Sequence, residues 1–158
     1  MNEEPSIKFR RIAEKLTENL LEVFGEELVS VTLFGSAARG ESREDSDIDL
    51  LIVIENLPKD RFERYELYRE AEEKLGDEAS RISPILKTPE EASRMSPLYL
   101  DLVEDSIILY DKNDFMKKIL ERLRKKLKNL GAKRVRRGKS WYWILKPDLK
   151  FGEVLEIE

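Results

Sequence analysis

Two apolar runs separated by a short polar segment constrain the fold more than any other feature of the 158-residue chain. Residues 28–34 are rich in β-branched and aromatic side chains and end at Gly35, a pattern typical of a buried strand followed by a tight turn. Residues 46–54 begin with polar side chains and end in a continuous apolar stretch, which predicts a strand buried on both faces. Small residues follow Gly35, so we expect a glycine turn and a short helix between the two strands.

This strand–turn–strand unit carries groups that suit a nucleotide. If Gly35 and Ser36 open a helix, their backbone N–H groups favour an anion such as a polyphosphate. Asp47 and Asp49 would share one face of a strand and repel each other unless a divalent cation lay between them. Such oxygen ligands suit Mg²⁺. Each motif alone is also consistent with an ordinary turn or with solvated acids, but their order and spacing together favour a nucleotide site.

Elsewhere helical patterns alternate with strand patterns, which indicates an α/β or α+β architecture. Pro84 lies in one expected strand and predicts an edge position for it. Thr88 and Pro89 together predict a capped helix start. We expect helices at residues 5–24, 60–75, 97–105 and from 114 to Gly131, strands at 79–86 and 106–110, and a hairpin within 134–145.

The last third of the chain is basic, although the net charge of the whole chain is −4. Residues 1–111 sum to −13 and residues 112–158 to +9, and we divide the chain into two parts there. Trp141, Tyr142 and Trp143 lie among the cations of the second part. Cations interleaved with aromatic rings can bind single-stranded RNA. The same pattern also fits tryptophans that pack in a core, or an interface with a protein partner.

Composition excludes several classes of chemistry. The chain has no cysteine, so disulfides, thiolate nucleophiles and zinc–thiolate sites are excluded. It has no histidine either, which leaves carboxylates, lysines and tyrosines for proton transfer. No stretch is apolar enough to cross a membrane, and the amino terminus lacks the pattern of a signal peptide. We therefore expect a cytoplasmic protein.

The segment Gly35–Gly40 followed by Asp47-Ile48-Asp49 resembles the signature of the minimal nucleotidyltransferases in the DNA polymerase beta superfamily. The resemblance spans about residues 7–110. It implies a small mixed sheet flanked by helices, which makes residues 1–111 a nucleotidyltransferase domain and residues 112–158 a basic helix and hairpin extension. It also implies Mg²⁺-dependent transfer of a nucleoside monophosphate, AMP from ATP, to a hydroxyl acceptor. Some members act as antitoxins that adenylylate a tyrosine of a HEPN-domain toxin.

The resemblance assigns Gly35 and Ser36 to the triphosphate, and Asp47 and Asp49 to Mg²⁺ and catalysis. Arg39 is consistent either with a phosphate contact or with an ion pair to Asp45 or Asp47. Ser36 is consistent with a phosphate ligand, with a helix N-cap, or with both. Members of the superfamily commonly place a third carboxylate on a later strand, where this chain has none and Ser83 stands near the position. A weakly active or inactive module that binds nucleotide, partner or RNA through its basic segment is therefore the alternative function.

Overall fold

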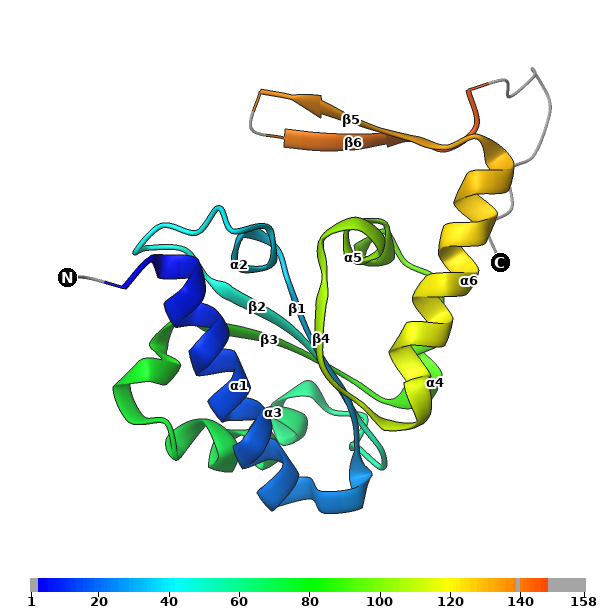
Figure 1. Ribbon diagram of the computed structural model, residues 1–158. Helices are drawn as coiled ribbons and strands as arrows, with labels where there is room; N and C mark the ends of the chain where they lie inside the picture. The colour runs from blue at the N-terminus through cyan, green and yellow to red at the C-terminus, as the bar shows by residue number, and fades with distance from the viewer. Residues whose placement is uncertain (1–2, 139, 148–158) are drawn as a thin grey trace.

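The computed structural model describes residues 3–138 and 140–147. A four-stranded sheet in the order β3-β2-β1-β4 forms its centre. β1 (Leu28–Phe34) is antiparallel to both β2 (Ile48–Ile54) and β4 (Ile107–Asp111), whereas β3 (Ile82–Lys87) is parallel to β2. The sheet is therefore mixed. This arrangement, with helices on both faces (Figure 1), confirms the α+β fold class with a small mixed sheet flanked by helices.

The two faces of the sheet carry separate apolar cores because side chains alternate along each central strand. On one face, Leu50 and Ile52 pack with α1 (Pro5–Phe24) and α3 (Arg61–Glu73). On the other face, Leu51 and Val53 pack with α5 (Leu98–Asp105) and α6 (Phe115–Leu130). The other described helices are short: α2 (Ser36–Arg39), α4 (Pro89–Ala92) and the 3₁₀ helices Gly25–Glu27, Gly76–Arg81 and Lys112–Asp114.

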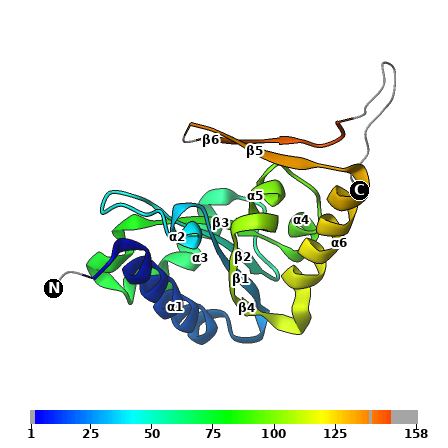
Figure 2. The same cartoon turned by 45° about the horizontal axis from the view of Figure 1, so that its top comes forward.

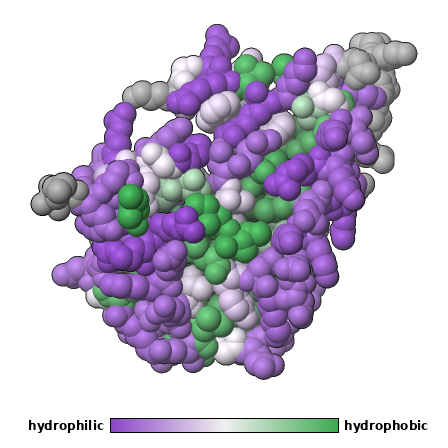
Figure 3. Space-filling view, viewed as in Figure 1, coloured by the Kyte–Doolittle hydropathy of each residue, from purple (hydrophilic) through white to green (hydrophobic). Residues whose placement is uncertain are grey.

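Helix ends follow the predicted signals closely. α1 begins at Pro5 and ends at Gly25, whose φ is +55°. Thr88 caps α4 in a capping box with Glu91, and Gly131 ends α6 in the left-handed region. β3 is an edge strand, as Pro84 indicated. β4 forms the other edge, and Figure 3 shows apolar surface gathered over it between the hydrophilic surfaces of α1 and α6.

Two expected strand starts were wrong. The second strand begins at Ile48 rather than at residue 46, because a turn closes before it: the Ser46 N–H donates to the Arg43 carbonyl, and the Arg43 N–H donates to Ser46 Oγ. The third begins at Ile82 rather than at residue 79, since Gly76–Arg81 forms a 3₁₀ helix. Ala79, the apolar residue at the expected start of that strand, is buried as part of the 3₁₀ helix.

The basic part of the chain begins with a helix that completes the second core. Its apolar side is buried against the sheet and α5 and consists of Met116, Leu120, Leu123 and Leu127. The chain then forms a two-stranded hairpin of β5 (Lys133–Arg137) and β6 (Ser140–Ile144), which Figure 2 shows above α2 and α5. The division at residue 111 stays a prediction. The part of the expected extension that follows residue 147 lies outside the described residues. None of the described helices is long and apolar enough to span a membrane.

Candidate active site

The glycine turn and the strand carboxylate are in direct contact. Gly35 follows β1, and Asp49 pairs with Phe34 in the antiparallel register of β1 and β2. A Cβ atom added to Gly35 would lie 2.3 Å from Asp49 Oδ2, so only glycine leaves room for the carboxylate. Gly35 also has φ +74° and ψ −153°, a region that is open essentially to glycine alone. Two independent constraints therefore require glycine at the turn.

Ser36 is the first residue of α2, and Gly35 occupies the N-cap position without a side-chain cap. The reading of Ser36 as an N-cap is thus wrong. Its Oγ lies 3.4 Å from Ser42 Oγ, and its carbonyl accepts a 2.9 Å hydrogen bond from the Glu41 N–H. The hydroxyl stays at the turn, partly exposed to solvent, where it can donate to an anion.

Asp47 lies in the loop before β2 and is exposed, whereas Asp49 is in the strand and partly buried. The expectation that both project from one strand face was therefore wrong for Asp47. The two carboxylates still interact. Burial raises the pKa of Asp49 above its ordinary value, and repulsion from Asp47 raises it further, while Arg39 lowers it. This is the electrostatic pattern of a carboxylate pair that a cation would stabilise.

Arg39 is the last residue of α2. Its side chain forms an ion pair with Glu41 at 3.4 Å, and not with Asp45 or Asp47 as one reading expected. Its influence on the pKa of Asp49 shows that its charge also acts on the carboxylate pair. The fold therefore brings Gly35, Ser36, Arg39, Asp47 and Asp49 together at the end of the sheet where β1 stops and β2 starts.

No acidic residue occupies the position of a third carboxylate on β3. Ser83 pairs with Asp49 in the parallel register and is exposed. Two of the nearest acids in sequence are engaged elsewhere: Glu78 pairs with Arg11 and Lys15 of α1, and Glu91 forms two hydrogen bonds with Arg64, while Glu90 is exposed. Within residues 3–138 and 140–147, acidic side chains do not cluster in threes in a way that could hold a metal.

The basic extension contributes a residue that the sequence did not single out. Arg136 of β5 lies 3.7 Å from Glu41, the same carboxylate that pairs with Arg39. The two arginines are 97 positions apart in sequence, so only the tertiary structure brings them to one acid. The only feature of the sequence that drew attention to the segment around Arg136 was its basic run with tryptophans.

Comparison with known proteins gives three kinds of finding. A family model described as a nucleotidyltransferase domain matches residues 10–127. A protein of Methanocaldococcus jannaschii, named as a candidate protein adenylyltransferase, is 36% identical over 139 residues, which cover 81% of this chain and 95% of that protein.

Solved structures resemble the chain more distantly. A toxin-antitoxin crystal structure with AMP-PNP has 21% identity, covers 75% of this chain and 92% of its own, and gives a TM-score of 0.49. An MNT antitoxin in complex with the tri-AMPylated HEPN toxin of Shewanella oneidensis has 18% identity, covers 78% and 92%, and gives 0.46. The family match covers most of the chain and includes the Gly35 turn and both aspartates. The chain therefore belongs to the nucleotidyltransferase-domain family and is an enzyme of that class.

Proposed function

We propose that this enzyme transfers AMP from ATP, with Mg²⁺, to a hydroxyl of a protein acceptor. The observation that carries this proposal is the contact between the Gly35 turn and the Asp49 carboxylate. A phosphate-binding turn and a metal-binding acid must lie side by side if one nucleotide is to use both. A cytoplasmic location stays a prediction.

Each residue has a role within this proposal. The N–H groups of Gly35 and Ser36, with the Ser36 hydroxyl, bind the triphosphate, and Arg39 contacts a phosphate. Asp47 and Asp49 hold Mg²⁺. Two carboxylates fit this ion because it is commonly bound through one or two carboxylates together with substrate phosphates. When bound, Mg²⁺ supplies charge neutralisation at the phosphates.

The proposed acceptor is a tyrosine of a HEPN-type toxin, which would make the chain an antitoxin. The name of the M. jannaschii relative supports transfer of an adenylyl group to a protein. The HEPN partner follows from the resemblance of the Gly35–Gly40 and Asp47–Asp49 motif to the minimal nucleotidyltransferases. Ser83 stands where a base would be expected, and loss of a general base typically costs about 10²- to 10⁴-fold in rate. We therefore expect slow transfer.

The test is to incubate the chain with Mg²⁺, a HEPN-type protein encoded beside its gene, and ATP labelled on either the α- or the γ-phosphate. Label on the α-phosphate should stay on the partner, and label on the γ-phosphate should leave with pyrophosphate. Asp47→Asn with Asp49→Asn should abolish labelling. Asp45→Asn, an exposed acid of the same loop, is the matched control and should label normally. Equal labelling by the double variant would place the reaction elsewhere.

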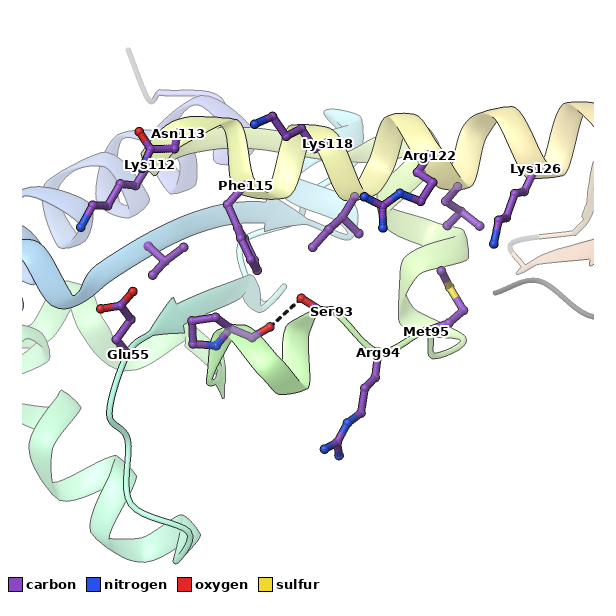
Figure 4. Close-up of a pocket in the computed structure, with 14 residues that line it drawn as sticks. Glu55, Ser93, Arg94, Met95, Lys112, Asn113, Phe115, Lys118, Arg122 and Lys126 are labelled. Carbon is purple, nitrogen blue, oxygen red and sulfur yellow. Dashed lines mark hydrogen bonds between the residues drawn. The ribbon is translucent and has the colours of Figure 1, made fainter.

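A second function, RNA binding through the basic segment, is favoured by a groove at the other end of the sheet. The groove has a volume of about 730 Å³ and runs between α6 and the segment of Ser93 and Met95 (Figure 4). Arg122 and Lys126 extend from α6 toward that segment, whereas Arg94 extends away from α6. The groove includes Val29 at the start of β1, so the length of that strand places it roughly 20 Å from the Gly35 turn.

Two cations of the groove are available to an anion. Within the part of the chain that the structure describes, neither Arg122 nor Lys126 forms an ion pair. Anisotropy of a labelled single-stranded RNA tests the proposal. Arg122→Glu with Lys126→Glu should weaken RNA binding and reduce its salt dependence. Lys117→Glu with Lys128→Glu makes the same charge change on α6 outside the groove and should weaken RNA binding less. Equal effects of both pairs would contradict a groove-specific site.

A further inference from the structure

The β5–β6 hairpin presents one face to the candidate active site. It lies above α2 and α5 in both cartoon views (Figures 1 and 2) and outside residues 10–127, the range that the family model matches. Arg136 is opposite Trp141, and Arg134 is opposite Trp143. Residues directly opposite each other in an antiparallel pair share a face, so these four side chains lie on the same side of the hairpin.

Ion pairs show that this shared face is the inner one, that is, the face turned toward α5 and the residues just after α2. Arg134 pairs with Asp105 at the end of α5, and Arg136 pairs with Glu41 just after α2. Trp143 packs against the core between the sheet and α6. Tyr142, on the other face, is 46% exposed. The inner face therefore carries two arginines and two tryptophans on the side that contacts Asp105 and Glu41.

The two arginines are held differently. The Arg134 side chain is only 12% exposed, and its guanidinium lies 4.0 Å from the centre of the Trp141 ring, so it is fixed by packing as well as by its ion pair. The Arg136 side chain is 48% exposed and stands 3.7 Å from Glu41, an exposed contact that contributes little to stability. Its Nε also donates to the Gly138 carbonyl at 3.1 Å, and its guanidinium lies 5.2 Å from the centre of the Trp141 ring. Arg136 can therefore exchange Glu41 for a stronger partner while its contacts within the hairpin stay in place.

Glu41 follows the C-terminal cap of α2, and its neighbour Ser42 reaches the turn that would bind phosphates, with its Oγ 3.4 Å from Ser36 Oγ. The Glu41 backbone N–H donates to the Ser36 carbonyl at 2.9 Å, and the Glu41 carboxylate is shared by Arg39 and Arg136 at 3.4 and 3.7 Å. Two cations thus face one carboxylate just after the C-terminal cap of α2. A triphosphate on that turn offers several anionic oxygens, which guanidinium groups bind more strongly than they bind one exposed carboxylate.

We propose that Arg136 is a nucleotide-binding residue, which leaves Glu41 and pairs with the triphosphate of ATP when the nucleotide occupies the Gly35–Ser36 turn. The hairpin then covers the bound nucleotide and carries Trp141 with it. This inference rests on the proposed nucleotide site. Arg137, the next residue, belongs to the outer face and takes no part.

The test measures the Kd of a non-hydrolysable ATP analogue with Mg²⁺ by calorimetry for the full chain and three variants. Arg136→Gln should weaken binding about tenfold, as expected for one charge-assisted contact. Arg137→Gln removes the same charge from the same hairpin and should leave the Kd unchanged. Glu41→Gln breaks the same ion pair from the other side and should bind as tightly as the wild type or more tightly, because Arg136 no longer has to leave a carboxylate.

The outcomes separate a nucleotide contact from a structural link. If Arg136→Gln binds like Arg137→Gln, or if Glu41→Gln weakens binding as much as Arg136→Gln, the proposal is overturned while the nucleotide site stands. If the wild type does not bind the analogue, the site and this inference fall together.

Fluorescence gives a second readout, because Trp141 and Trp143 are the two tryptophans of the chain. Addition of the analogue with Mg²⁺ should change the emission of the wild type and of Trp143→Phe. The same addition should leave Trp141→Phe almost unchanged. A change that persists in Trp141→Phe would contradict movement of the hairpin tip over the nucleotide.

Discussion

Gly35 is the residue whose replacement should separate stability from function most clearly. Gly35 and Gly25 both have a positive φ with extended ψ, so alanine at either position should cost about 1–3 kcal/mol of unfolding free energy through backbone strain. Only at Gly35 would the new Cβ collide with Asp49, since nothing lies within 4 Å of a Cβ at Gly25. Gly35→Ala should therefore also lose nucleotide binding, whereas Gly25→Ala should keep it.

Urea unfolding measures the unfolding free energy of each variant, and calorimetry with an ATP analogue measures its nucleotide binding. Retention of full affinity in Gly35→Ala would show that the turn does not carry the triphosphate.

Asp49 should destabilise the folded protein in the absence of metal. Burial and Asp47 raise the pKa of Asp49 above its ordinary value of 3.8. A carboxyl whose pKa is raised by folding favours the folded state at low pH and opposes it once ionised, so its contribution at pH 7 is unfavourable. Asp49→Asn should therefore raise the melting temperature of the metal-free protein.

Differential scanning calorimetry without Mg²⁺ shows whether the melting temperature of Asp49→Asn lies above or below that of the wild type. The same variant should lose transfer activity, and a lower melting temperature would mean that Asp49 supports the fold rather than a ligand.

Among contacts between elements, the ion pair of Arg64 and Glu91 stands out. Arg64 on α3 is buried and donates to the carbonyls of Pro58 and Leu86 and to both oxygens of Glu91, which is on α4. Arg64→Ala should cost roughly 2–3 kcal/mol, because it removes the guanidinium from the two carbonyls and from the Glu91 carboxylate, which keeps only the Thr88 N–H as a donor. Arg69→Ala, which removes exposed ion pairs from the same helix, should cost at most about 0.5 kcal/mol. Chemical denaturation of both variants gives the comparison, and similar losses would contradict it.

The same ion pair predicts a pH dependence of stability. Hydrogen bonds from Arg64, and after them hydrogen bonds from Thr88, lower the pKa of Glu91 from 4.5 to about 2. A carboxyl whose pKa is lowered by folding stabilises the protein above its ordinary pKa and loses that contribution as the pH falls toward the lowered value. The wild type should lose this stability between about pH 4.5 and pH 2, and Glu91→Gln should lose less over that range.

Melting temperatures measured across this range for the two proteins test the sign. An identical decline in both would show that Glu91 does not contribute to acid unfolding.

Local signals predicted most elements, and contacts distant in sequence account for what was missed. Pro5 and Gly25 bound α1, and Thr88 caps α4, because proline, glycine and threonine act on the backbone within a few residues. The start of β2 was misplaced because a Ser46–Arg43 turn competes with the strand. The contact of Gly35 with Asp49 depends on the register of two strands, which the apolar pattern alone does not fix.

The molecule has two charged regions at opposite ends of its sheet. The carboxylate pair and the glycine turn lie where β1 ends, and the basic groove lies where β1 begins. The hairpin extends from the end of α6 back over the first region, which explains why Arg136 reaches Glu41 although the two are 95 positions apart. The basic extension therefore contacts the candidate active site through Arg136 and lines the groove through α6.

A crystal structure with Mg²⁺ and a non-hydrolysable ATP analogue is the measurement that tests the proposed site most directly. It should show the triphosphate on the N–H groups of Gly35 and Ser36, and a metal about 2.0–2.1 Å from oxygens of Asp47 and Asp49. A nucleotide bound in the groove along α6, with Asp47 and Asp49 free of metal, would contradict the account.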